Sequence, residues 1–186
     1  NGLVVHNCSE YMFLDDTACN LASINLVRFY DAETGAFDMD GYRHAIRLWA
    51  IVLEVSVLMA QFPSQSVAQL SYAYRTLGLG YANLGALRML MGVPYDSSEG
   101  FAIAGALTSV LGGESYAASA EMAGELGAFP RFNENKKPML RVVRNHRRAA
   151  YNANAAEYEG IDVKPIGIDP SHCPEGFLKP ARDAWD

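Results

Sequence analysis

The stretch Cys8–Leu26 reads CSEYMFLDDTACNLASINL and carries the most informative pattern in the chain. Its second half places Leu21, Ile24 and Leu26 among small polar residues, which predicts a buried strand over residues 19–26. The first half and the residues just before it hold the densest polar chemistry of the sequence: His6, Asn7, Cys8, Glu10, Asp15, Asp16 and Cys19. We therefore expect a loop with reactive side chains that leads directly into the interior of the fold.

Cys8 and Glu10 are two residues apart, so an extended loop places the thiol and the carboxylate on the same side. That pair suits a reaction that needs a sulfur radical or nucleophile together with a general base. Cys19 follows eleven residues later and can join a redox pair if the chain folds back. The alternative role for Cys19 is that of a small buried apolar residue.

This stretch resembles the finger loop of the adenosylcobalamin-dependent (class II) ribonucleotide reductases, whose motif is Asn-Pro-Cys-Ser-Glu followed by a close relative of YMFLDDTACNLASINL. The likeness covers nearly everything from Cys8 to Asp186. It includes the blocks Gly78–Met91, Pro94–Glu99, Gly112–Glu121 and Met139–Tyr151. The resemblance implies an α/β fold, in which residues 8–186 are a helix-rich segment of a ten-stranded α/β barrel, incomplete at both ends, that carries the central finger loop.

The resemblance also implies roles for three side chains. Cys8 is the site of a thiyl radical that takes the 3′-hydrogen of the ribose. Glu10 acts as general base and acid, and it removes the 3′-hydroxyl proton so that the 2′-hydroxyl leaves as water. Cys19 and a cysteine from another part of the reductase supply two electrons and end as a disulfide. Adenosylcobalamin is the implied cofactor, and no residue of this chain is assigned to it.

The implied substrate is a ribonucleotide, and the resemblance favours a diphosphate. The implied partners are the remaining N- and C-terminal parts of the same reductase, and a thioredoxin-type reductant that acts through a C-terminal tail. The chain opens on Asn1 and stops at Asp186. We therefore expect it to be a piece of a longer protein, without reductase activity alone.

Residues 1–7 have a separate interpretation. An apolar run, Leu3-Val4-Val5, precedes His6, Asn7 and Cys8. The Asn7 amide can attack its own backbone carbonyl, His6 can assist as acid, and the Cys8 thiolate can accept an acyl group. This resembles the C-terminal end of an intein followed by the first extein residue. It also explains why His6 and Asn7 stand where the reductase motif has asparagine and proline, so that residues 1–7 are expected to be an intein remnant.

Composition limits the other possibilities. The 186 residues are 50% apolar and 19% charged, which favours one globular domain with a real core. Fifteen basic residues against 21 acidic ones argue against nucleic-acid or membrane-surface binding. The longest uncharged run, Val55–Tyr74, contains Pro63 and is not a membrane span. Three cysteines and no signal peptide indicate a reducing, cytoplasmic compartment.

Periodicity predicts the remaining elements. A helix is expected over residues 39–61 with a stripe of Ile46, Trp49, Leu53 and Val57, ended by Phe62-Pro63. Further segments are predicted from caps and from glycine and proline positions. They are a strand over residues 2–6, a turn over 31–37, a helix over 82–91, a helix from residue 97 to 126 with a break at Gly112-Gly113, a loop over 129–137, a helix from Pro138 to about 154, a loop over 157–176 and a final helix.

Several other patterns are assigned no chemistry. Gly78-x-Gly80 lacks the later acidic residue of a dinucleotide site and is interpreted as a strand-to-helix turn. His172-Cys173 has no second ligand pair for zinc, so no metal site is predicted. His44 and His146 fall on predicted helices and are expected to be structural. A basic row on one helix is expected to pair with carboxylates or solvent rather than to bind phosphate: Arg141, Arg144, Arg147 and Arg148.

Two other functions stay open on the residues alone. One is a cysteine hydrolase in which Cys8 is the nucleophile and a distant histidine, oriented by an Asn or Asp, is the base. The other is a helical interaction module without chemistry, which the alanine-rich helices favour.

Overall fold

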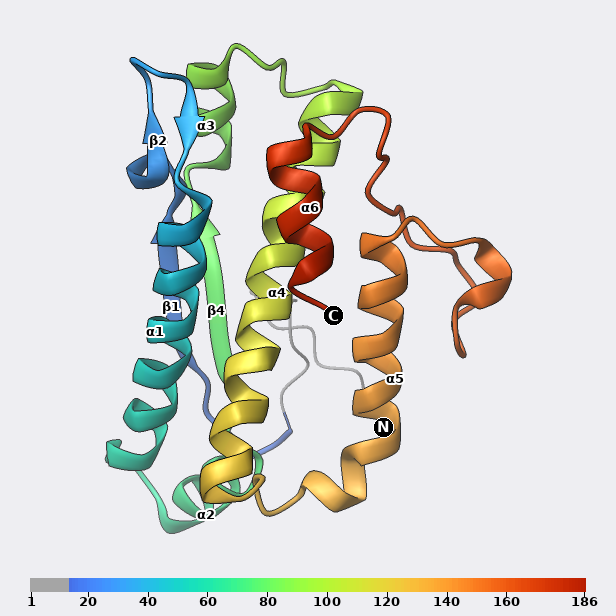
Figure 1. The fold of residues 1–186 in the computed structure, drawn as a ribbon. Helices are drawn as coiled ribbons and strands as arrows, with labels where there is room; N and C mark the ends of the chain where they lie inside the picture. The colour runs from blue at the N-terminus through green and yellow to red at the C-terminus, as the bar shows by residue number, and fades with distance from the viewer. Residues whose placement is uncertain (1–13) are drawn as a thin grey trace.

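The computed structural model describes residues 14–186 (Figure 1). The predicted strand over residues 2–6, and the candidate residues His6, Asn7, Cys8 and Glu10, lie outside these residues. In the described part, helices surround a pair of parallel strands, β1 (Asn20–Asn25) and β4 (Leu77–Ala82). A second pair, β2 (Tyr30–Asp31) and β3 (Ala36–Phe37), forms an antiparallel hairpin at the predicted turn.

Strand β1 confirms a strand within the predicted residues 19–26, but the predicted burial holds only in part, since Ile24 and Leu26 are buried and Leu21 is 64% exposed. Strand β1 pairs with β4 in register from Asn20 opposite Leu77 to Asn25 opposite Ala82. The expected turn at Gly78-x-Gly80 is wrong, because both glycines lie inside β4. A Cβ on Gly78 would overlap the Leu21 side chain and lie 3.2 Å from the Asn20 carbonyl oxygen. Glycine therefore lets the two strands approach closely, and the turn into the next helix comes at Asn83.

The connection between the parallel strands consists of α1 (Met39–Met59) and α2 (Gln65–Tyr74). The Asp38 side chain caps α1 by accepting a hydrogen bond from the Gly41 N–H at 2.9 Å. The helix ends before Phe62-Pro63, as predicted. Its buried stripe differs from the predicted one in one place, since Ala50 is buried and Trp49 is 42% exposed. The expectation also missed α2, which begins after the capping residue Ser64.

Helix α3 (Leu84–Met91) is followed by α4 (Ser98–Leu126), and the Ser97 side chain caps α4 by accepting a hydrogen bond from the Gly100 N–H. The predicted break at Gly112-Gly113 is wrong, because α4 continues through both residues. A Cβ on Gly113 would overlap Ala184, and one on Gly112 would lie 3.1 Å from the Trp185 ring. These glycines therefore let the C-terminal segment pack directly on α4, and they do not end the helix.

We expect Gly113→Ala to destabilise the protein by about 1–3 kcal/mol, because the added methyl group has no room beside Ala184. Gly124→Ala is the matched control in the same helix, since nothing lies within 4 Å of a Cβ there. That control should stabilise the protein by about 0.5–1 kcal/mol through helix propensity. Urea unfolding of both variants measures the difference, and equal effects would contradict the packing role.

Helix α5 (Phe132–Ala150) starts six residues before the predicted start at Pro138, which lies inside the helix. The predicted polar loop over residues 129–137 is therefore wrong from Phe132 onward. Local contacts explain the earlier start: the rings of Phe129 and Phe132 lie 5.6 Å apart, and the Asn135 amide donates to the Arg131 carbonyl at 2.9 Å. These contacts stabilise the first turn of α5, which the sequence analysis had assigned to a loop.

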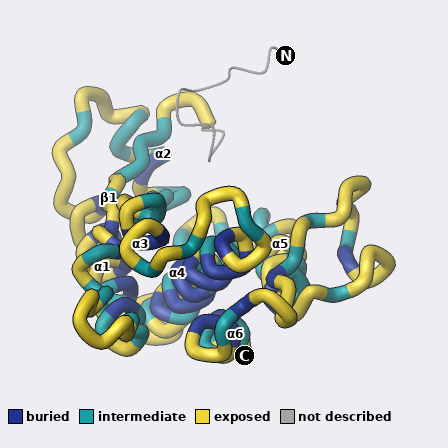
Figure 2. Tube along the Cα trace, turned by 90° about the horizontal axis from the view of Figure 1, so that it is seen from above, coloured by how far each residue is buried: buried dark blue, intermediate teal, exposed yellow. Residues whose placement is uncertain are grey.

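After α5, the short 3₁₀ helix η2 (Ala155–Glu157) and a long loop lead to α6 (Glu175–Asp183). The core lies where α1 and α4 meet the strands and α6, and Figure 2 shows the buried residues along α4. Arg43 and Arg47 of α1 bind the buried Glu114 of α4 across this contact, at 2.6 and 3.6 Å.

The helix-rich α/β class is confirmed, but residues 14–186 contain no closed sheet. In this part of the chain no helix is long and apolar enough to cross a membrane.

Candidate functional site

The described part of the predicted reactive loop runs from Leu14 to Cys19 and forms a tight turn. Thr17 donates to the Leu14 carbonyl from its backbone N–H, at 3.2 Å, and from its hydroxyl, at 2.6 Å. Asp16 sits in the left-handed region with φ of 57°. The turn therefore sets the direction in which the chain reaches Cys19.

Ala18 anchors this turn to α2. Its backbone N–H donates to the Ser71 hydroxyl at 3.0 Å, and Ser71 is 2% exposed. Next along the chain, the Asn20 amide reaches the Leu53 carbonyl of α1 at 3.5 Å. The residues on both sides of Cys19 are thus tied to the two helices that connect β1 and β4.

The Cys19 thiol is partly buried at the amino ends of β1 and β4. Its Sγ lies 3.5 Å from the Asn20 carbonyl oxygen, and a Cβ on Gly78 would lie 3.0 Å from the same sulfur. Gly78 therefore leaves the space that the thiol occupies. A cysteine fixed at the end of a strand, and not fully enclosed, has the placement that thiol chemistry requires.

An ion pair fixes the end of α2 that carries Ser71. The Arg75 guanidinium binds the Glu54 carboxylate of α1, and both side chains are mostly buried. The Arg75 N–H also donates to the Ser71 carbonyl at 2.7 Å and closes the helix. Arg75 thereby holds the C-terminal end of α2, which includes the Ser71 contact with Ala18, against α1.

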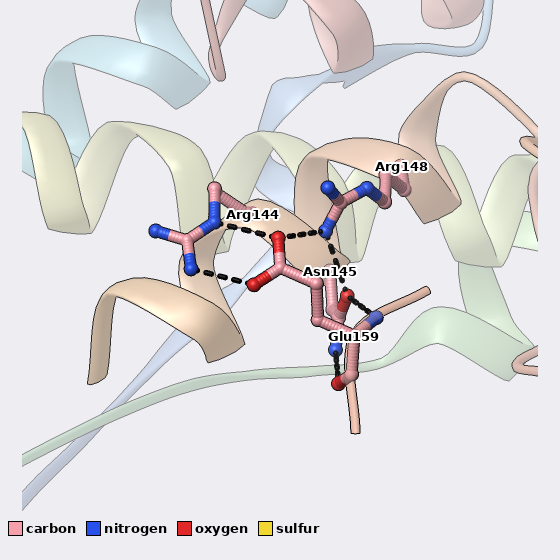
Figure 3. Close-up of polar contacts among 4 residues, drawn as sticks. All are labelled: Arg144, Asn145, Arg148 and Glu159. Carbon is pink, nitrogen blue, oxygen red and sulfur yellow. Dashed lines mark hydrogen bonds and ion pairs between the residues drawn. The ribbon is translucent and has the colours of Figure 1, made fainter. Parts of the chain in front are cut away.

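The basic row on α5 pairs with acidic groups, as expected (Figure 3). Glu159 receives Arg144 Nε and Nη2 at 2.7 and 2.6 Å and Arg148 Nη1 at 2.7 Å. Asn145 exchanges two hydrogen bonds of 2.9 Å with the Glu159 main chain. Arg147 binds Asp186 at 2.7 Å. Three of the four arginines are therefore satisfied within the chain, which disfavours a phosphate site there.

The same contacts predict an acid dependence of stability. Arg144, and then Arg148, lower the pKa of Glu159 to about 2 from its ordinary value of 4.5. A lowered pKa contributes stability above pH 4.5 that is lost as the pH falls towards 2. We expect Glu159→Gln to flatten the loss of stability in this window, measured as urea midpoints from pH 5 to pH 2. The control is Glu134→Gln in the exposed pair with Arg131, and an identical flattening there would contradict the assignment.

Within the described residues, the remaining histidines and Cys173 belong to no cluster of metal ligands. Residues 14–186 hold no group of three or more His, Cys, Asp and Glu side chains suited to a metal ion. Burial raises the pKa of the Cys173 thiol to about 11. His44 is exposed on α1, and His146 stacks on the Trp185 ring at 5.5 Å. His172 pairs with Asp169 at 2.9 Å in the loop before α6.

Comparison with known families gives a clear match. The family model described as the barrel domain of ribonucleotide reductase matches residues 6–180. The chain belongs to this ribonucleotide reductase family. The match begins before Cys8 and includes Glu10, Cys19 and both strands of the parallel pair.

Relatives within this reductase family are close in sequence. The vitamin B12-dependent ribonucleotide reductase of Agrobacterium fabrum is 61% identical over 180 residues, and that of Bradyrhizobium diazoefficiens is 58% identical over 180. Each alignment covers 96% of this chain and 14% of the relative. The vitamin B12-dependent ribonucleoside-diphosphate reductase of Mycobacterium tuberculosis is 31% identical over 129 residues, covering 69% of this chain and 18% of the relative. The chain therefore spans about one seventh of the length of its close relatives.

Sequence reasoning missed two reductase residues that position Cys19. Ser71 lies inside a helix and belongs to no motif, so no signal in the sequence marks its contact with Ala18. Gly78 was noticed, but its spacing to Gly80 was interpreted as a turn. Its role depends on the pairing with Leu21, 57 residues earlier in the chain, which periodicity does not reveal.

Proposed function

We propose that this chain is the part of a vitamin B12-dependent ribonucleotide reductase that carries the thiyl-radical cysteine. The enzyme converts ribonucleotides to 2′-deoxyribonucleotides and so supplies precursors for DNA. One observation carries the proposal: the family match over residues 6–180 includes the whole stretch from Cys8 to Leu26. The names of the relatives that are 58–61% identical support the same reductase class.

In this proposal, Cys8 and Glu10 act together on the ribose. The Cys8 thiyl radical takes the hydrogen atom from C3′ and becomes a thiol. The Glu10 carboxylate takes the proton of the 3′-hydroxyl, and the 2′-hydroxyl takes a proton from one of the two reducing thiols and leaves as water. The same thiol later returns the hydrogen to C3′, so that the radical is regenerated. The sulfur must come within about 3–3.5 Å of the reacting C–H bond.

Cys19 supplies reducing equivalents. It and a second cysteine, from a part of the reductase outside this chain, give two electrons and two protons to the substrate radical. The two sulfurs end as a disulfide, which balances the loss of the 2′-oxygen as water. The partly buried position of Cys19 at the start of β1, with its sulfur beside Gly78, is compatible with this role.

Adenosylcobalamin is the cofactor of this proposal and supplies the first radical when it is bound. Two grooves within residues 14–186 are open to solvent and carry charged side chains, such as Arg141 and Arg144 in one and Arg43 and Glu114 in the other. Neither suits a corrin ring, so we assign no described residue to the cofactor.

The substrate proposed is a ribonucleoside diphosphate. The name of the Mycobacterium tuberculosis relative, a ribonucleoside-diphosphate reductase, supports the diphosphate. The proposed partners are the remaining N- and C-terminal parts of the same polypeptide and a thioredoxin-type reductant. The proposed location is the cytoplasm, without binding to nucleic acid or membrane.

The junction between Asn7 and Cys8 is proposed as a protein-splicing site, with residues 1–7 as the end of an intein. His6 and Asn7 occupy the two positions where the reductase motif has asparagine and proline. The mature reductase should then have a mass that lacks residues 1–7 and a peptide in which Asn-Pro precedes Cys8. A mature protein that retains His6-Asn7 would exclude splicing and leave the reductase proposal intact.

The alternatives are a cysteine hydrolase and a non-catalytic helical module. The exposed pair of His172 and Asp169 is the one described feature that suits a hydrolase, since the carboxylate orients the imidazole. The family match favours the reductase over both. Reactivity of Cys8 towards a substrate-like acyl electrophile would support the hydrolase.

The test of the proposed function is the reduction of a ribonucleoside diphosphate by the complete, processed polypeptide with a dithiol reductant. We expect deoxynucleotide only when adenosylcobalamin is present. Equal product without the cofactor, or none with it, would contradict the proposal.

A further inference from the structure

Helix α1 has a second apolar face that nothing in the described residues covers. Its inner face, which includes Tyr42, Ile46 and Leu53, is buried against the strands and α4. Figure 1 shows α1 at one margin of the molecule, with β4 and α4 to its inner side. The outer face carries six large apolar side chains that are 44–77% exposed: Leu48, Ile51, Val52, Val55, Leu58 and Met59.

The spacing of these residues fits packing against another helix. They recur three and four residues apart over more than two turns, which places them in one stripe along the helix. A stripe of this pattern accepts the ridge of another helix. Isolated exposed apolar residues are ordinary on a protein surface, but a continuous stripe marks an interaction site.

The stripe presents no solvated charge, and this favours its burial against another apolar surface. From Leu48 to Met59 the only ionisable residue is Glu54. Its carboxylate is bound by Arg75 and is mostly buried, so it does not project from the outer face as a solvated charge. A helix that is apolar on both sides belongs in the interior of a larger protein.

The sheet beneath α1 indicates what lies over the stripe. Within the described residues β1 has only β4 as a neighbour, and β4 has only β1, so each strand has one unpaired edge. Parallel strands belong to larger sheets, and each added parallel strand brings a connecting helix that packs on a face of the sheet. The matched region is 14% of the Agrobacterium fabrum relative, which leaves 86% of such a polypeptide to supply these elements.

We propose that the outer stripe of α1 is an internal docking surface for a helix from the part of the same polypeptide outside these 186 residues. The inference rests on the family membership and the size of the relatives. It does not depend on the radical chemistry, so its test and the reductase assay can fail separately.

The test uses the complete polypeptide with Val52→Cys or Val55→Cys, both conservative in size. Maleimide labelling is followed at each peptide by mass spectrometry, which separates the new thiol from the native cysteines. The control is Glu33→Cys at the exposed turn between β2 and β3. We expect labelling at positions 52 and 55 to be at least about tenfold slower than at position 33, because labelling then requires local opening.

Each other outcome overturns the proposal. Labelling as fast as at position 33 means that the stripe faces solvent. Slow labelling that becomes fast on dilution means that a second copy covers it. A photo-crosslinker at Val55 distinguishes coverage by the same polypeptide from coverage by a second copy. We expect a crosslink within one polypeptide, to a peptide beyond these 186 residues. A crosslink to a second copy or to another protein contradicts the assignment.

Discussion

Cys19→Ser in the complete, processed reductase is expected to stop multiple turnover with a dithiol reductant. Serine has nearly the same shape, so the loop held by Ala18 and Gly78 should keep its geometry. Its hydroxyl cannot give up electrons by forming a disulfide, so the substrate radical is not reduced. The measurement is deoxynucleotide formed per enzyme under reducing conditions.

The matched control for this variant is Cys173→Ser. Cys173 is buried against the Ala102 carbonyl, and burial raises the pKa of its thiol to about 11, so it is not a reactive thiolate at neutral pH. This control should keep its turnover number. Normal multiple turnover by the Cys19 variant would show that Cys19 is a packing residue and not a redox partner.

Glu10→Gln is expected to lower kcat by about 10²–10⁴-fold, the usual contribution of a general base, while KM changes little. Glutamine keeps the size of the side chain but cannot accept the 3′-hydroxyl proton. Glu33→Gln, on the exposed turn between β2 and β3, is the control and should leave kcat unchanged. An unchanged kcat in the Glu10 variant would refute its role as the base.

Local patterns predicted the elements that local chemistry determines. The strand from Asn20 to Asn25 follows from its apolar positions, and α1 follows from the period of its apolar stripe. The pairing of the basic row also followed from charge, because several arginines on one helix face need carboxylates nearby. The Glu159 contacts bear this out.

The errors came from contacts between residues far apart in the chain. Gly113 was expected to break α4, but its missing side chain makes room for Ala184, 71 residues later. Gly78 was assigned to a turn, but it lies in a strand opposite Leu21. In each case the backbone propensity of glycine was estimated correctly, and the tertiary contact decided the structure.

The candidate site also combines residues that the sequence indicates with residues that only the tertiary structure reveals. The roles proposed for Cys8, Glu10 and Cys19 came from residue type, spacing and the resemblance to the finger loop, and Cys8 and Glu10 lie outside the described residues. The supports of Cys19, at Ser71, Gly78 and the pair of Arg75 with Glu54, depend on how α1 and α2 fold against β1. No local sequence pattern indicates packing of this kind.

The central claim is that the sulfur of Cys8 exchanges a hydrogen atom with C3′ of the ribose. The direct measurement compares the complete, processed reductase with its Cys8→Ala variant on a ribonucleotide deuterated at C3′, in the presence of adenosylcobalamin. We predict that the unmodified enzyme gives deoxynucleotide that retains the deuterium, at a reduced rate, and that the alanine variant gives none. Deoxynucleotide from the alanine variant would contradict the account.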